Sequence, residues 1–124
     1  MESQQTQLSQ NFACFIRHGE RADCVEDESL LVLPKENTID KFDPPLTKVG
    51  VEQAAETGRF LRKELGETKF IIRCSPFIRT IMTACSIAMN LADEPPTVII
   101  DSKNAEILGT INFKENPMPK LELY

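Results

Sequence analysis

The stretch "KFIIRCSPFIRTIMTACSIAMN" (69–90) decides the fold, because it pairs a strand with a helix that follows at once. Its first part, "KFIIRCS" (69–75), is a nearly continuous apolar run, which is typical of a strand buried on both faces. Ser75 and Pro76 then supply a helix N-cap and a proline at the first helical position. We predict a helix over about 76–92, with a core-facing apolar stripe at Ile78, Ile81, Met82, Cys85, Ala88 and Met89.

Two more apolar runs and one more helix flank this unit. The runs "FACFIR" (12–17) and "PPTVIID" (95–101) each indicate a strand, the first of them covered on both faces. A helix is predicted from an N-cap at Thr47 to an end near Gly66, with small and apolar residues at Val51, Ala54, Ala55, Gly58, Leu61 and Leu65. Strand, helix, strand, helix, strand in this order predicts a layered α/β domain with a parallel sheet and right-handed crossovers.

Three segments show neither the helical spacing of apolar residues nor a strand-like apolar run. Residues 1–11 are polar and glutamine-rich, and we expect them to be a flexible start. Residues 22–46 are long for a connection in a small domain, which is typical either of a lid or specificity loop or of an ordinary surface loop. The last dozen residues contain two prolines and give no clear pattern.

The composition limits the class of protein. With 124 residues, 41% hydrophobic and 27% charged, the chain has the size and composition of one globular domain. The formal net charge of −5 argues against nucleic acid or an anionic membrane as the main partner, and no apolar run approaches membrane-spanning length. Four cysteines without a Cys-x-x-Cys pair, beside a single histidine, predict reduced thiols, a cytoplasmic protein and no metal or other cofactor.

Residues suited to phosphate chemistry follow each predicted strand. Arg17, His18 and Arg21 lie at the end of the first strand, Arg79 follows the second, and Glu106 follows the third. Because ligands collect outside the carboxyl ends of parallel strands, we expect these side chains to meet at one edge of the sheet. A solvated basic turn and a surface glutamate remain the alternatives for each residue taken alone.

This set of side chains fits phosphoryl transfer. Each arginine beside His18 disfavours a second positive charge, so the imidazole favours a neutral form with a free lone pair and is a candidate nucleophile. The three arginines would neutralise the phosphoryl oxygens, with help from the start of the following helix. Glu106 is the carboxyl best placed to protonate the departing oxygen.

Three motifs resemble, in order, those of the histidine phosphatase superfamily, also called the phosphoglycerate mutase-like family. They are "IRHGE" (16–20), "DPPLTKVGVEQAAETGRFL" (43–61) and "IRCSPFIRTIMTA" (72–84), within a resemblance over roughly residues 12–106. The longer "RHGERAD" is most similar to the subgroup of TULA-type tyrosine phosphatases and ecdysteroid-phosphate phosphatases. The resemblance implies a three-layer α/β sandwich with a mainly parallel sheet.

The same resemblance implies a role for each site residue. His18 would be the phosphorylated nucleophile and Glu106 the proton donor, although Asn104 stands where the family usually has leucine. The phosphate ligands would be Arg17, Arg21 and Arg79.

One departure from the family is larger than the others. Family members carry a second catalytic histidine on a later, central strand, whereas His18 is the only histidine here. The resemblance therefore implies that residues 12–124 are a truncated, partial domain lacking the C-terminal part with that histidine.

Three functions stay open at this stage. The first is a phosphatase of phosphomonoesters, phosphotyrosine among them, acting through phospho-His18 with weak or lost activity. The second is an inactive phosphate-binding or interaction module, and the third is a phosphoglycerate mutase-type phosphotransferase. The expected partner is a phosphorylated small molecule or protein, and self-association through an exposed sheet edge is a further expectation.

Overall fold

A computed structural model describes residues 13–33, 43–66 and 68–104 of the chain. Two helices and two strands form its framework: helix α2 (Lys48–Leu65), strand β1 (Ile72–Cys74), helix α3 (Ile78–Leu91) and strand β2 (Val98–Ile100). Three short 3-10 turns complete the description: η1 (Ala22–Cys24), η2 (Glu28–Leu30) and η4 (Ser102–Asn104). Within this part of the chain, no helix is both long and apolar enough to cross a membrane.

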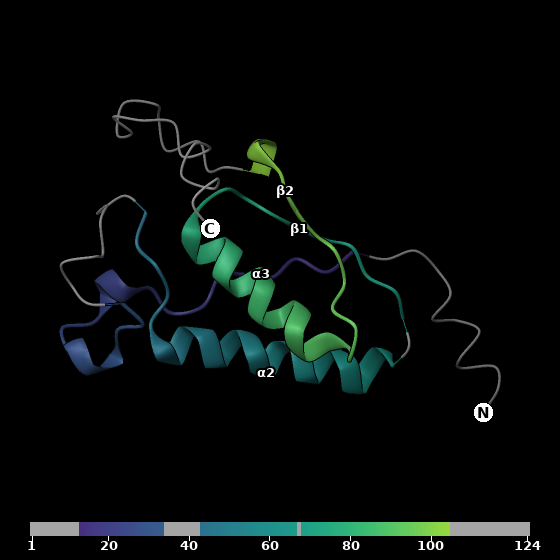
Figure 1. Cartoon of the computed structure of the whole chain (residues 1–124), viewed down its shortest axis with the longest axis horizontal. Helices are drawn as coiled ribbons and strands as arrows, with labels where there is room; N and C mark the ends of the chain where they lie inside the picture. Colours follow the sequence, from purple (N-terminus) through teal and green to yellow (C-terminus); the bar gives the residue numbers. More distant parts are fainter. Residues whose placement is uncertain (1–12, 34–42, 67, 105–124) are drawn as a thin grey trace.

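The two strands form a parallel sheet, which confirms the predicted α/β class. Ile72 pairs with Val98 and Cys74 with Ile100, and the Ile72 N–H donates to the Thr97 carbonyl at 3.1 Å. Helix α3 contacts both strands, and α2 packs along α3 (Figure 1). Both strands are shorter than the runs 69–75 and 95–101 predicted from the sequence.

Helix α2 begins and ends where the sequence predicts. The Thr47 hydroxyl accepts a hydrogen bond from the Gly50 N–H at 3.0 Å, so Thr47 is the N-cap. At the other end Gly66 adopts a φ of 57°, which favours glycine, and its N–H donates to the Arg62 carbonyl at 2.9 Å.

Small residues let α3 approach α2 closely. Ala54, Ala55 and Gly58 are buried on the face of α2, in agreement with the predicted stripe. A Cβ added at Gly58 would lie 2.6 Å from the Ile87 carbonyl oxygen and 2.9 Å from the Asn90 Cβ. Glycine at this position therefore sets the spacing between the two helices.

The predicted start of α3 is wrong by two residues. The N-cap is Phe77, and the Asp43 carboxylate accepts a hydrogen bond from the Ile78 N–H at 2.9 Å. Ser75 instead shares a hydrogen bond of 2.7 Å with the Thr80 hydroxyl. A side chain distant in the sequence thus binds the first N–H of the helix, and local propensity did not reveal it.

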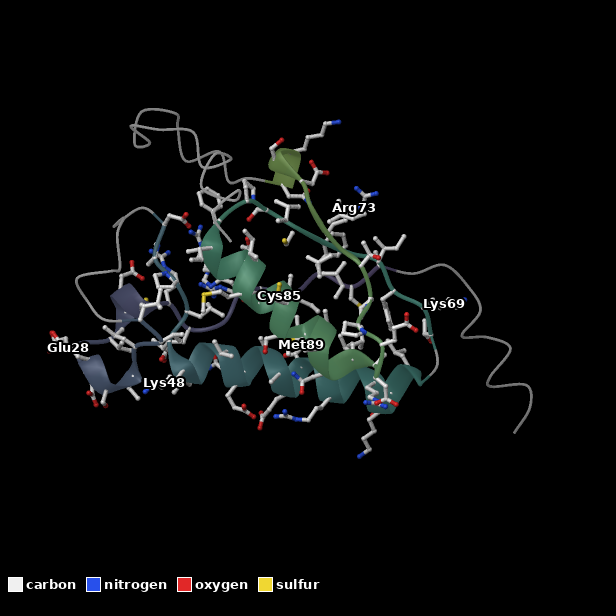
Figure 2. All side chains as sticks on the ribbon, viewed as in Figure 1. Glu28, Lys48, Lys69, Arg73, Cys85 and Met89 are labelled. Atoms are coloured by element: carbon white, nitrogen blue, oxygen red, sulfur yellow. The ribbon has the colours of Figure 1, made fainter. Side chains whose placement is uncertain are left out.

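The predicted core stripe of α3 is confirmed only in part: Ala88 is buried, and Ile78, Ile81 and Met82 are half-buried. Cys85 is exposed and Met89 is 71% exposed, one turn further along the helix (Figure 2). The buried residues are Arg79, Thr83, Ala84, Ile87, Ala88 and Leu91. Thr83 takes an inward position because its hydroxyl accepts from the Gly19 N–H, and the Arg79 guanidinium lies against the Phe77 ring. An apolar periodicity cannot register either contact.

The predicted strand at 12–17 is not formed over residues 13–17, and these residues are exposed. The sheet of the described residues contains only β1 and β2, so no strand pairs with this segment there. An apolar run forms a strand when another strand hydrogen-bonds to its backbone and other elements cover its side chains. Among the described residues, no strand pairs with 13–17 and these residues are exposed.

Candidate active site

The loop that carries His18 is tied to both helices by backbone hydrogen bonds. The Gly19 N–H donates to the Thr83 hydroxyl of α3 at 3.2 Å, and the Glu20 N–H donates to Oε1 of Gln53 on α2 at 2.9 Å. Thr83 in turn donates to the Arg79 carbonyl at 2.7 Å, one turn earlier in α3. The chain of contacts fixes the His18 loop relative to the first turn of α3.

Two glycines allow the loop to lie directly on the start of α2. A Cβ at Gly19 would collide with the backbone carbonyl of Gly50, and a Cβ at Gly50 would collide with the backbone of Glu20. The glycine after the histidine is therefore required by close approach of two backbones.

Thr47 holds the loop as well as capping α2. Its N–H donates to the Glu20 carbonyl at 2.9 Å, and its hydroxyl donates to Oε1 of Glu20 at 2.8 Å. Thr47 and its neighbour Leu46 are completely buried, and the Ala22 N–H donates to the Pro45 carbonyl at 2.8 Å. The sequence 43–47 thus anchors the loop on its second side.

The histidine ring has a defined tautomer. Nδ1 of His18 lies 2.8 Å from the carbonyl oxygen of the next residue, Gly19. A carbonyl oxygen only accepts hydrogen bonds, so Nδ1 carries the proton in this contact. The Nε2 atom of the neutral ring then carries the lone pair, as a nucleophile requires.

Arg79 lies in the first turn of α3. It is only 2% exposed, its Nε and Nη1 atoms are buried, and its guanidinium carbon lies 4.5 Å from the centre of the Phe77 ring. A cation over an aromatic face gains electrostatic attraction and a fixed orientation. Thr83 therefore connects the backbone of Arg79 with the His18 loop, while the Arg79 side chain is buried and oriented against Phe77.

The two arginines beside His18 have different surroundings. Arg17 is exposed. Arg21 makes two hydrogen bonds to Asp23, from Nε at 2.9 Å and from Nη2 at 2.6 Å. Burial alone would raise the pKa of the Asp23 carboxyl, but the bonds and charge of Arg21 outweigh it and leave the pKa below its ordinary value. A phosphate bound by Arg21 would have to share that guanidinium with Asp23.

His18 lies on a groove of about 800 Å³ between residues 13–18 and the β1 segment. Four polar side chains share this groove with it: Ser75 and Asn104, which follow β1 and β2, and Thr80 and Thr83 of α3. The floor is apolar and comes from α3, with Ala84, Ile87 and Leu91. Of the predicted site residues that the structure describes, His18 lines this groove, whereas Arg17, Arg21 and Arg79 are not among its lining residues, so the convergence expected for these side chains stays a prediction.

The remaining site prediction, Glu106, lies outside the described residues. The positioning residues Thr47, Gly50, Gln53 and Thr83 were not identified as part of the site from the sequence. Their contacts are polar or backbone-mediated and join positions more than 25 residues apart, so no local pattern indicates them. Within 13–33, 43–66 and 68–104, no group of three or more histidine, cysteine or acidic residues could hold a metal ion.

In a comparison with family models, residues 13–108 match the histidine phosphatase superfamily, branch 1. No curated protein matches the chain. The matched range includes the His18 loop, α2, β1, α3 and β2, which together form the geometry described above. The chain belongs to the histidine phosphatase superfamily.

Proposed function

We propose that the chain acts on phosphomonoesters through a phosphohistidine formed at His18. The observation that carries this proposal is the hydrogen bond from Nδ1 of His18 to the Gly19 carbonyl, which leaves Nε2 as the nucleophilic nitrogen. Membership of the superfamily supports a phosphatase or mutase type of activity. The "RHGERAD" stretch supports the TULA-type and ecdysteroid-phosphate phosphatase subgroup as the nearest in substrate.

In the first step, Nε2 attacks phosphorus and the bond from phosphorus to the ester oxygen breaks. The departing oxygen takes a proton from an acid, for which Glu106 is our candidate. In the second step, water attacks phosphorus and gives a proton back to the same carboxylate, the N–P bond breaks, and phosphate and the neutral imidazole are released. Arg79, already buried and oriented, would stabilise the charge on the phosphoryl oxygens, with Arg17 and Arg21 at the exposed side.

The proposal is tested by hydrolysis of an aryl phosphate by the full chain and by its His18→Ala variant. We expect slow turnover that disappears in the variant, while circular dichroism shows both chains folded to the same extent. The matched control is Arg59→Ala, an exposed residue of α2 outside the site, which should retain the turnover. Equal turnover by the His18→Ala variant would show that another group is the nucleophile.

A second function, a phosphate-binding module without turnover, is favoured by one observation: His18 is the single histidine of the 124 residues. In that case the chain binds inorganic phosphate, Arg79→Ala abolishes the binding, and no aryl phosphate is hydrolysed. Transfer of phosphate between hydroxyls of a sugar acid, without net hydrolysis, would instead indicate a mutase.

A further inference from the structure

We propose that Asp23 is a positioning residue that holds the Arg21 guanidinium and lowers the affinity of the His18 site for phosphate. This inference rests on the proposed function, because it takes Arg21 as one of the phosphate ligands. Three observations support it: the geometry of the Arg21–Asp23 ion pair, the backbone contacts that hold the pair together, and the charge that the pair carries.

The contact between Arg21 and Asp23 occupies one whole edge of the guanidinium. Nε of Arg21 donates to Oδ1 of Asp23 at 2.9 Å, and Nη2 donates to Oδ2 at 2.6 Å. An arginine binds two oxygens of a phosphoryl group in the same bidentate manner. A phosphoryl group therefore cannot bind this edge of Arg21 while Asp23 occupies it.

The backbone on either side of the pair is fixed by hydrogen bonds. Ala22, which lies between the two residues, is buried, and its N–H donates to the Pro45 carbonyl at 2.8 Å. The turn η1 is closed by the Cys24 N–H, which donates to the Arg21 carbonyl at 3.1 Å. The fold therefore keeps the Asp23 carboxylate within hydrogen-bonding distance of the Arg21 side chain.

The pair lies where a dissolved anion can reach it. The Arg21 side chain is 34% exposed and the Asp23 side chain is 39% exposed. Arg21 is not among the residues that line the groove with His18. A phosphate that binds at His18 must therefore share Arg21 with Asp23 or draw it away from Asp23.

The charge of Asp23 opposes the binding of an anion. Burial acts to raise the pKa of its carboxyl, but the hydrogen bonds and the charge of Arg21 outweigh burial, so the pKa stays below its ordinary value and the carboxylate is ionised at neutral pH. Together the two side chains carry no net charge, whereas the Arg21 side chain by itself carries one positive charge. A phosphate dianion beside Arg21 is repelled by the Asp23 carboxylate.

This repulsion acts on the release of product. The phosphate formed when the phosphohistidine is hydrolysed contacts the same arginines as the substrate, and it blocks the site until it leaves. Because Asp23 competes with phosphate for Arg21, the product binds more weakly and inhibits the next turnover less. Asp23 thus acts through Arg21 and does not itself touch the reacting atoms.

The test measures binding of inorganic phosphate to the full chain and to its Asp23→Asn variant, by isothermal titration calorimetry at neutral pH. Asparagine has nearly the shape of aspartate but lacks the charge, so we expect the variant to bind phosphate roughly three- to tenfold more tightly. Asp23→Glu restores the charge and should return the affinity towards that of the original chain. The matched control is Asp93→Asn, which removes the carboxylate that binds Arg62 at 2.9 Å near the end of α2, and it should leave the affinity unchanged.

Two further measurements separate this role from a purely structural one. In ¹⁵N NMR, the Nε–H signal of Arg21 should shift in Asp23→Asn before any phosphate is added, because its acceptor has lost its charge. Arg21→Ala should weaken phosphate binding, and in that background Asp23→Asn should change the affinity by less than roughly twofold, since Asp23 acts through Arg21. If the chain turns over aryl phosphate, KM and the inhibition constant of phosphate should fall together in Asp23→Asn.

The possible failures can be told apart. Equal or weaker binding of phosphate by a folded Asp23→Asn chain, while Arg21→Ala lowers the affinity, would overturn this inference and leave the proposed function standing. Unchanged binding in Arg21→Ala would also overturn it, because Arg21 would then not be a phosphate ligand. Absence of phosphate binding in both the original chain and Asp23→Asn would overturn the proposed function and this inference together.

Discussion

Thr83 joins helix α3 to the loop that carries His18. Its buried hydroxyl accepts from the Gly19 N–H and donates to the Arg79 carbonyl, so one atom connects the candidate nucleophile's loop with the turn that holds the buried arginine. Removal of that oxygen leaves a donor without its partner in a partly buried place, which typically costs about 1–3 kcal/mol. We regard Thr83 as a positioning residue.

The prediction for Thr83→Val is a faster hydrogen exchange of the Gly19 amide and a loss of about 1–3 kcal/mol in the free energy of unfolding. If the chain turns over aryl phosphate, kcat should fall with little change in KM, because His18 is displaced and substrate contacts are kept. Thr83→Ser, which restores the hydroxyl, should recover both properties. Unchanged Gly19 exchange in the valine variant would contradict the role given to Thr83.

Cys74 has a buried thiol whose pKa and reactivity can be tested. Burial, and then the charge of Cys85, raise the pKa of the Cys74 thiol to about 11. At pH 8 about one thiol in a thousand is then a thiolate, the form that reacts with iodoacetamide. In the folded chain the exposed thiols of Cys14, Cys24 and Cys85 should be alkylated first, and Cys74 only after unfolding in urea.

Mass spectrometry of the labelled peptides checks this order. The pKa of Cys74 is higher in the folded chain than in the unfolded chain, so its protonated thiol adds to the free energy of unfolding below about pH 9. This contribution is lost as the pH rises towards about 11. Labelling of Cys74 at the rate of Cys85 in the folded chain would show that β1 is open.

At the scale of the elements, the packing of α2 against α3 determines how the site is supported. Gly58 has no room for a methyl group beside the Ile87 carbonyl and the Asn90 Cβ. Replacement of an exposed helical glycine by alanine usually stabilises a helix by about 1 kcal/mol. Here we expect Gly58→Ala to destabilise the fold by about 1–3 kcal/mol, because α3 must move away from α2.

Urea unfolding followed by circular dichroism measures the effect of Gly58→Ala. Glu56→Ala, at an exposed position of the same helix, is the control and should change stability by no more than about 0.5 kcal/mol. An increase in stability for Gly58→Ala would mean that the helices are further apart than described.

The elements also show what a sequence reveals and what it does not. Helix α2 was predicted correctly because its N-cap Thr47, its small-residue stripe and its C-terminal Gly66 are all local signals. The inward face of α3 was predicted only in part, because Thr83 is buried by a polar contact with the distant Gly19 and Arg79 by packing against the Phe77 ring. The strand at 13–17 was not formed because strand structure depends on neighbours that the run itself does not encode.

At the scale of the whole molecule, the sheet and the site meet in one groove. His18, strand β1 and the residues Ser75 and Asn104 that follow β1 and β2 all line it. The family was predicted from three short motifs and their order, and it is confirmed by the match over residues 13–108. The groove beside β1 comes from tertiary structure, and no motif predicted it. The His18 tautomer rests on a contact with the adjacent Gly19 carbonyl, whose geometry the sequence motif does not show.

The central claim is that His18 accepts a phosphoryl group, and the most direct measurement is detection of that group on the protein. The chain is mixed with an excess of aryl phosphate, quenched in alkali, where a phosphoramidate bond survives, and digested for mass spectrometry. We predict a phosphate adduct on the peptide that contains His18, absent from the Arg79→Ala variant and removed by brief acid treatment. A folded chain that hydrolyses the ester but carries its adduct on another residue, or carries none at any time, would contradict the claim.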